Sequence, residues 1–315
     1  MPARCIAVLQ RGTCEVTDKI LAAQAAGAVG AVVFNQGDSA DRTGLWWTSL
    51  GALADIQVPV LLTTYDIGVD FVQAPSGSVV IEMDVDVIHE LRPTASVIAE
   101  TADADDVLVL GAHLDSVLTG PGINDNGSGV AALLEVARAI HGCETTRSVR
   151  FAWWTAEEVG LVGSTQYVES LDPTARDAIW AYLNFDMVGS PNWARFRFDG
   201  DGSAFAPGGP PGSGELEQAF VDYFDGIGIT TEEIAFGGRS DYVAFVDHDI
   251  AAGGLFTGAE GVKTDAQAEA HGGRAGAAFD GCYHAACDDI DNVDLDALET
   301  SARAIAYALE VHALP

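Results

Sequence analysis

The sequence predicts an α/β protein in which a mostly parallel, mixed sheet is flanked by helices and is preceded by a smaller α/β domain. Short continuous apolar runs alternate with segments of helical periodicity, a pattern typical of parallel strands that are covered on both faces. The chain has 315 residues, which is long enough for two domains. Small residues at 74–77 separate two such patterns. We therefore expect one domain over residues 1–85 and a second over residues 86–315.

The smaller domain is expected to alternate strands with a helix. A first apolar strand covers residues 5–9, and Thr17 is expected to cap a helix that ends near Ala26. Buried strands follow at residues 28–34 and 58–62.

The larger domain shows the same alternation over a longer stretch. Continuous apolar runs predict strands at residues 107–111, 149–154 and 178–185. Apolar residues at helical spacing predict helices near residues 130–137, 214–224 and 295–312. The segment 200–214 is rich in Gly and Pro and predicts a surface loop.

The charge of the chain excludes two classes of partner. Lys and Arg number 15 against 47 Asp and Glu, a formal net charge of −32. Such a negative field repels nucleic-acid phosphates and anionic membrane surfaces, so we expect neither as a partner. The hydrophobic fraction of 48% nevertheless indicates a folded core rather than a disordered acidic chain.

Five cysteines are too few for a disulfide scaffold, and none forms the C-x-x-C pair of a structural zinc site. Cys282 and Cys287 are close enough in sequence to form a local bridge.

Acidic and imidazole side chains follow the three predicted strands of the larger domain. His113 and Asp115 follow the first strand, Glu157 and Glu158 the second, and Asp186 the third. Because the carboxyl ends of parallel strands meet at one edge of a sheet, we expect these side chains to lie close together.

Two further segments supply residues for the same edge. The glycine-rich stretch 122–129 lies between the first strand and its helix, and it contains Asp125. A late loop adds Tyr283 and His284.

Five carboxylates at one edge would repel one another strongly unless a cation were present. Imidazole together with carboxylate ligands favours zinc over calcium or magnesium. We expect His113 and Asp186 to hold one ion and Glu158 and His284 to hold another. Asp125 would bridge the two ions at the ~3.5–4 Å separation of two-metal hydrolases.

Each motif taken alone has a simpler interpretation. His-x-Asp occurs often by chance, Asp125 and the residues after it could form a turn and a helix cap, and Asp186 could cap a helix. An adjacent Glu pair usually lies on a solvated face. Only the ordered combination at successive strand ends favours the metal centre.

The ordered motifs resemble those of the co-catalytic dizinc aminopeptidases of the secreted leucyl aminopeptidase and aminopeptidase Y type. The motifs are His113-Leu114-Asp115, Asp-Asn-Gly-Ser-Gly at 125–129, Glu-Glu-x-Gly-Leu-x-Gly-Ser at 157–164, Asn-x-Asp-Met at 184–187 and Cys-Tyr-His at 282–284. The resemblance covers about residues 90–315 and implies a zinc exopeptidase fold.

The resemblance implies a role for each residue. The metal ligands would be His113, Asp125, Glu158, Asp186 and His284. Glu157 would be the general base, and Tyr283 would polarise the scissile carbonyl. Asp115 would orient His113, as metal-bound imidazoles usually require. The peptide bond that joins Asp125 to Asn126 is typically cis in these enzymes.

The resemblance also implies a specificity pocket. The segments Arg239-Ser240-Asp241 and 254–259 would shape it around the N-terminal side chain of the substrate. Arg239 would belong to its binding surface, and Met187 and Phe256 would form its apolar walls.

The first 85 residues resemble a protease-associated domain in segments 6–14, 22–35 and 58–60. In the related enzymes such a domain is inserted in the peptidase and follows a further N-terminal segment. Met1 would then lie inside the insertion, and the domain would be incomplete at its N-terminus.

The expected activity is therefore that of a metalloaminopeptidase with two zinc ions. It would remove an apolar N-terminal residue such as leucine from peptides or proteins with a free N-terminus, and we expect a monomer. One alternative is a carboxypeptidase on the same scaffold, which would need a cationic cluster, and only Arg239 is a candidate. Another is an inactive receptor-like module, which missing metal ligands would mark, although none is missing.

The location is expected to be extracellular, although no signal peptide precedes the first strand in this sequence. We predict a disulfide between Cys282 and Cys287, because it would fix Tyr283 and His284 in the loop that it closes. Such a bond implies an oxidising compartment.

Overall fold

The computed structural model describes residues 5–39, 42–46, 48, 50, 55–86, 92–101 and 106–315. The chain divides into two compact units, Met1–Arg92 and Pro93–Pro315. The domain boundary near residue 85 stays a prediction.

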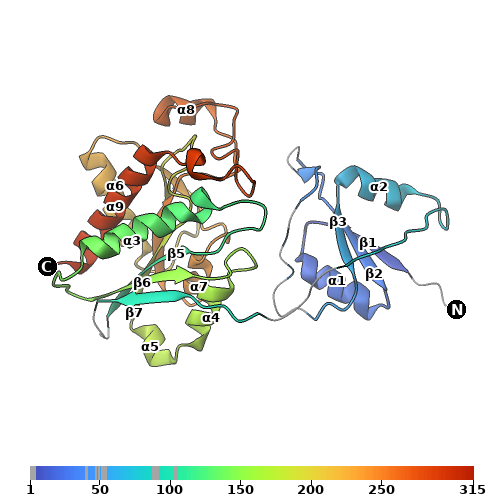
Figure 1. The fold of residues 1–315 in the computed structure, drawn as a ribbon, viewed down its shortest axis with the longest axis horizontal. Coiled ribbons are helices and arrows are strands. Elements are labelled where there is room, and N and C mark those ends of the chain that lie inside the picture. Colours follow the sequence, from blue (N-terminus) through green and yellow to red (C-terminus); the bar gives the residue numbers. More distant parts are fainter. Residues whose placement is uncertain are drawn as a thin grey trace. The chain divides into compact units, whose positions relative to one another are not determined.

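The first unit contains a parallel sheet of three strands in the order β1-β2-β3 (Figure 1). The strands are β1 (Ile6–Gln10), β2 (Gly30–Phe34) and β3 (Val60–Thr63), and the helices are α1 (Val16–Ala25) and α2 (Tyr65–Gln73). All five residues of β2 are buried, and Val16 and Ile20 of α1 pack into the same cluster as Ala31 and Val33.

Two features of this unit differ from the sequence expectation. Helix α1 begins at Val16 after Glu15, and the hydroxyl of Thr17 donates instead to the main-chain carbonyl of Leu50 at 2.8 Å, so the capping prediction was wrong. Helix α2 was not predicted, because its apolar residues mark no buried face. Ile67 is 46% exposed, and only Gly68 is buried, in a position where a Cβ atom would overlap the ring of Phe34.

The second unit is built on a mixed sheet of seven strands in the order β4-β6-β5-β7-β10-β8-β9. The strands are β4 (Val97–Glu100), β5 (Val107–His113), β6 (Ser148–Trp154), β7 (Ile179–Phe185), β8 (Phe196–Phe198), β9 (Glu232–Ile234) and β10 (Ala251–Phe256). The pairs β4·β6 and β10·β8 are antiparallel, and the other neighbours are parallel. The mostly parallel, mixed sheet expected from the sequence is confirmed.

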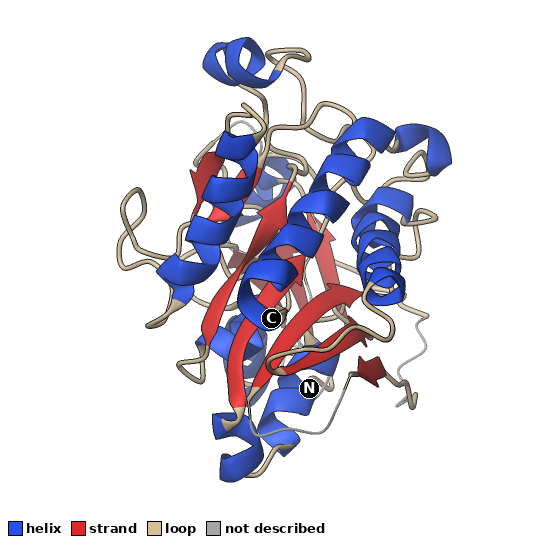
Figure 2. Ribbon diagram, turned by 90° about the vertical axis from the view of Figure 1, so that its left-hand side faces the viewer, coloured by secondary structure: helices blue, strands red, loops and turns tan. Residues whose placement is uncertain are grey.

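Helices cover both faces of this sheet, as Figures 1 and 2 show. The helices of this unit are α3 (Gly129–Ala139), α4 (Val162–Ser170), α5 (Pro173–Asp177), α6 (Ser213–Gly226), α7 (Tyr242–Val246), α8 (Asp265–His271) and α9 (Leu295–Ala313), with the short helical segments η2 (Ile123–Ser128) and η3 (Ile290–Asn292).

The alternation of side chains along β5 assigns the helices to their faces. Leu108 and Leu110 belong to a cluster with residues of α3, α6 and α9. Val107 and Val109 belong to a second cluster with residues of α4 and α7. Strand β5 is therefore buried on both sides, which explains its continuous apolar sequence.

Strand β10 lies inside the sheet but was not predicted as a strand. Its sequence Ala-Ala-Gly-Gly-Leu-Phe has no β-branched residue. Gly254 is required there, because a Cβ atom would lie 1.9 Å from the main-chain oxygen of Asn184 on the neighbouring strand. Strand β4 was also missed, and all four of its residues are exposed. Among the helices that the structure describes, none has the length and apolar character required to cross a bilayer.

Candidate active site

The predicted site residues meet at the carboxyl ends of the central strands. His113 is the last residue of β5, Glu157 and Glu158 follow β6, and Asp186 follows β7. Asp125 lies in η2, and His284 lies in the loop after α8. All six side chains line one pocket, so the convergence at one sheet edge is observed.

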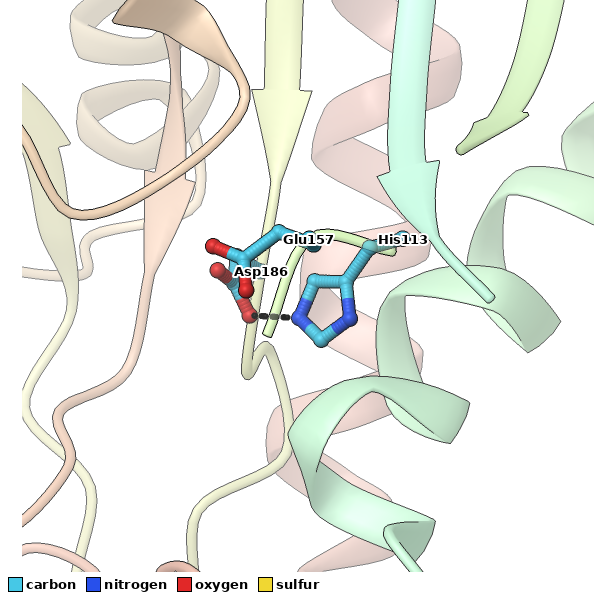
Figure 3. Close-up of side chains that lie close together, drawn as sticks. All are labelled: His113, Glu157 and Asp186. Carbon is cyan, nitrogen blue, oxygen red and sulfur yellow. Dashed lines mark hydrogen bonds and ion pairs between the residues drawn. The ribbon is translucent and has the colours of Figure 1, made fainter. Parts of the chain in front are cut away.

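The first group of candidate ligands comprises His113, Glu157 and Asp186. Figure 3 shows the three side chains pointing toward one another from separate segments. Their ligand atoms lie within 4.8 Å of one another, and Nε2 of His113 is 3.3 Å from Oδ1 of Asp186. His113 is 1% exposed, so its imidazole is enclosed by protein.

The second group comprises Asp125, Glu158 and His284. Nε2 of His284 is 3.1 Å from Oδ2 of Asp125 and 3.1 Å from Oε2 of Glu158. The other carboxylate oxygen of Glu158, Oε1, is buried and has no hydrogen-bond partner among the described residues. A buried oxygen of this kind fits a cation ligand.

Asp125 joins the two groups. Its Oδ1 is 3.1 Å from Nε2 of His113, and its Oδ2 is 3.1 Å from Nε2 of His284. One carboxylate therefore presents one oxygen to each group, which is the arrangement of a bridging ligand. The Asp125–Asn126 peptide bond is cis, as the resemblance implied. The donors, imidazole nitrogens and carboxylate oxygens, fit zinc.

The electrostatics of the site are dominated by burial and by charge pairing. Burial would raise the pKa of Asp125, but hydrogen bonds from His113 and His284 outweigh it and lower the pKa to about 2. Burial would lower the pKa of His284, but Asp125 and Glu158 raise it to about 9.

Glu157 differs from the other carboxylates. Burial raises its pKa well above the ordinary value, and the opposing charge of His113 does not cancel the effect of burial. A carboxylate with a raised pKa is a stronger proton acceptor than an ordinary one.

Asp115 contacts the site in two ways. Nδ1 of His113 lies 2.9 Å from the main-chain oxygen of Asp115, so Nδ1–H can donate to that carbonyl and leave Nε2 to face the carboxylates. The carboxylate of Asp115 instead accepts the main-chain N–H groups of Glu157 and Glu158, at 3.0 and 3.2 Å. The closest contact with His113 is thus made by the main chain. The side chain, whose Oδ1 lies 3.9 Å from Nδ1 of His113, holds the segment that carries the Glu pair.

The walls of the pocket include the predicted Met187 and Phe256. Phe198 and Ile234 line the same pocket and were not predicted, because β8 and β9 are only three residues long and carry no clear periodicity. Ser240 was expected only as part of a segment that shapes the pocket, with no role for its own side chain. Its hydroxyl donates to Oδ2 of Asp186 at 2.7 Å.

Arg239 lies at the pocket but is not a free cation. Its guanidinium donates to both oxygens of Glu260, at 2.8 and 3.2 Å, and to the hydroxyl oxygen of Tyr283 at 3.2 Å. Because Tyr283 accepts this bond, its own proton remains available to donate. Burial raises the pKa of Tyr283, which keeps that proton on the hydroxyl.

The predicted disulfide between Cys282 and Cys287 is present, with their Cα atoms 5.3 Å apart. It closes the short loop that carries Tyr283 and His284. The remaining described cysteines, Cys5, Cys14 and Cys143, are exposed and form no disulfide.

Comparison with known proteins gives relatives of considerable similarity. The "Aminopeptidase" of Pseudomonas aeruginosa PAO1 is 50% identical over 308 residues, which cover 97% of this chain and 57% of the relative. "Leucine aminopeptidase 2" of Trichophyton rubrum is 45% identical over 311 residues, which cover 98% of this chain and 62% of the relative. The chain thus spans about 57–62% of the length of these relatives.

Solved structures support the fold. An aminopeptidase from Aneurinibacillus sp. strain AM-1 matches with a TM-score of 0.76 and 24% identity, over 98% of this chain and 69% of the other. BSAP, a zinc aminopeptidase from Bacillus subtilis, matches with a TM-score of 0.68 and 22% identity, over 98% and 70% of the two chains. At this identity the likeness shows the fold alone.

Family models match both parts of the chain. Residues 3–70 match the PA domain, and residues 87–309 match peptidase family M28. Because the second match extends over more than half of the sequence and contains every candidate ligand, the chain belongs to peptidase family M28.

Proposed function

We propose that this chain acts as a zinc-dependent aminopeptidase that removes the N-terminal residue of peptides, with a preference for apolar residues such as leucine. The observation that carries the proposal is the position of the Asp125 carboxylate. One of its oxygens lies near His113 of the first group, and the other lies near His284 of the second group. His113 and Asp186 would hold one zinc ion, and Glu158 and His284 would hold the other. Asp125 would be a ligand of both ions. The names of the relatives support the same activity.

The charge of the pocket supports an aminopeptidase over a carboxypeptidase. Among the described residues that line the pocket, Arg239 is the one Lys or Arg side chain, and Glu260 already binds it. A substrate carboxylate would find no unpaired guanidinium there. A protonated α-amine, by contrast, would meet the carboxylates of the site. The receptor-like alternative is disfavoured because every expected ligand is present.

The catalytic roles follow from the positions of the side chains. Two zinc ions bound here would lower the pKa of a water molecule and polarise the scissile carbonyl. Glu157 would accept a proton from the attacking water and pass it to the departing amine. Tyr283 would donate its hydroxyl proton as a hydrogen bond to the oxyanion that develops on the substrate. Met187 and Phe256 would contact the apolar side chain of the N-terminal residue.

The disulfide supports a location outside the cytosol, since such bonds persist in oxidising compartments. We therefore propose that the chain acts as a secreted enzyme on peptides. The monomeric state stays a prediction.

The proposal is tested with leucyl-p-nitroanilide and its N-acetyl derivative, each with and without a metal chelator. Leaving a buried charge without its partner costs about 2–5 kcal/mol, so the acetylated substrate should react roughly 30-fold or more slowly. The chelator should abolish the hydrolysis of the free-amine substrate, and added zinc should restore it. Equal rates on the two substrates would refute the exopeptidase assignment.

The hydroxyl of Tyr283 is expected to act in the transition state. Tyr283→Phe should lower kcat by about 10-fold to 100-fold with little change in KM, at or below the loss from a single oxyanion-hole donor. Steady-state kinetics on leucyl-p-nitroanilide check this. An increase in KM alone would make Tyr283 a substrate-packing residue instead.

The disulfide is expected to serve the site more than the fold. A loop this short gains only about 2 kcal/mol of stability from its closure. The double variant Cys282→Ser, Cys287→Ser should therefore lower zinc content and kcat while the chain remains folded. Cys143→Ser, at an exposed free cysteine, is the matched control and should change neither. Full activity and full zinc content in the double variant would contradict the prediction.

A further inference from the structure

A buried polar network lies behind Asp125, outside the set of residues that line the pocket. Asp280 and Asp288 are 1% and 2% exposed, and Asn124 and Asn292 join them. Buried carboxylates are costly unless every oxygen is satisfied. Among the described residues, neither carboxylate forms an ion pair with Lys, Arg or His, and N–H groups donate to both.

Asp288 holds the segment that precedes and includes the bridging carboxylate. Its Oδ1 accepts the main-chain N–H of Asn124 at 2.9 Å, and its Oδ2 accepts the main-chain N–H of Asp125 at 3.1 Å. The main-chain oxygen of Asp288 accepts the N–H of Ile123 at 3.0 Å. Three successive N–H groups are thus fixed by one residue, and the third belongs to Asp125 itself.

The same network reaches the loop of the second imidazole. The amide nitrogen of Asn292 donates to Oδ1 of Asp288 and to both oxygens of Asp280, each at 3.0 Å. Oδ1 of Asp280 accepts the main-chain N–H of Cys282 at 2.8 Å, where the disulfide loop begins. Asn124 closes the network by donating to Oδ2 of Asp280 at 2.7 Å.

We propose that Asp288 is a positioning residue for the metal centre, because its carboxylate fixes the main chain of Asp125 and Asn292 couples that carboxylate to the loop of His284. Asp288 does not line the pocket and acts only through Asp125 and the loop. The inference deepens the proposed function and rests on it, since it assumes that Asp125 and His284 bind zinc.

The contacts explain why a carboxylate is required at residue 288. Two main-chain N–H groups need two acceptor oxygens, and an amide offers only one. In Asp288→Asn the amide NH₂ group would face the N–H of Asp125, or after a flip the N–H of Asn124. In either orientation a buried donor of this segment loses its acceptor.

The test measures zinc affinity of the full chain by competition with a chelator, together with the absorption spectrum of the Co²⁺-substituted protein. Metal-bound groups that lose such a supporting contact typically lose 10–100-fold in affinity, so Asp288→Asn should bind zinc roughly 10–100-fold more weakly and should shift the Co²⁺ spectrum. Asp289→Asn is the matched control, because this neighbour is exposed and its carboxylate accepts the main-chain N–H of Asp291, outside the segment 123–125. It should leave affinity and spectrum unchanged.

A second variant, Asn292→Ala, keeps the contacts of Asp288 with Asn124 and Asp125 but removes the link to Asp280. We expect a smaller loss of zinc affinity in the same direction. If Asp288→Asn does not fold, the zinc affinity of Asn292→Ala becomes the test, and an unchanged zinc affinity in that variant refutes the proposal. If neither variant folds, the network is a determinant of the fold and the proposal is wrong.

The positioning role of Asp288 and the proposed function fail in different experiments. Wild-type zinc affinity in Asp288→Asn, alongside a wild-type chain that binds zinc and cleaves leucyl-p-nitroanilide, overturns the positioning role alone. A wild-type chain that binds no zinc overturns the proposed function and this inference with it.

Discussion

Replacing Glu157 with Gln is expected to lower kcat by roughly 10²–10⁴-fold, the contribution of a general base, while zinc remains bound. The side chain lies in the pocket that both groups of candidate ligands line, and burial raises its pKa. Glutamine keeps the size of the side chain but cannot accept the proton of the attacking water. The measurement is kcat on leucyl-p-nitroanilide together with zinc content on the same sample.

The competing assignment makes Glu157 a metal ligand. Its carboxylate belongs to the group of His113 and Asp186, whose ligand atoms lie within 4.8 Å. If that assignment were correct, Glu157→Gln would lose zinc, and added zinc would restore part of the activity. The zinc content of the variant therefore separates a base from a ligand.

Glu158→Gln is expected to behave differently, by losing metal. Oε2 of Glu158 is 3.1 Å from Nε2 of His284, and Oε1 is buried and has no hydrogen-bond partner in the part of the chain that the structure describes. A neutral amide is a weaker ligand than a carboxylate, so zinc affinity should fall. Loss of a residue that only supports a ligand typically lowers metal affinity by roughly 10–100-fold, and loss of a ligand itself should lower it by at least that much. Activity should fall with zinc occupancy and recover in part with excess zinc. If Glu158→Gln kept its zinc while Glu157→Gln lost it, the two assignments would have to be exchanged.

The core of the candidate site could be predicted because it follows from strand order. His113, the Glu pair and Asp186 come directly after apolar runs, and the ends of parallel strands meet at one edge. Asp125 and His284 lie on irregular segments, and the ordered motifs were required to assign them to the same edge.

Other features depend on tertiary contacts that no local pattern encodes. Strand β10 is a strand because it packs between β7 and β8, although Gly253 and Gly254 disfavour one. Asp115 was expected to orient His113, but a sequence does not indicate whether the main chain or the side chain of a residue makes a contact. Asp288 and Asp289 are adjacent and chemically identical, and only burial separates the supporting carboxylate from the exposed one.

The most direct test of a two-zinc aminopeptidase is a zinc titration of the metal-free full chain, followed by the rate of leucyl-p-nitroanilide hydrolysis. The account predicts no activity without metal and a rate that rises with added zinc to a plateau near two equivalents, because Asp125 serves both groups. Full activity of the metal-free chain, or a rate that does not depend on bound zinc, would contradict the two-zinc assignment.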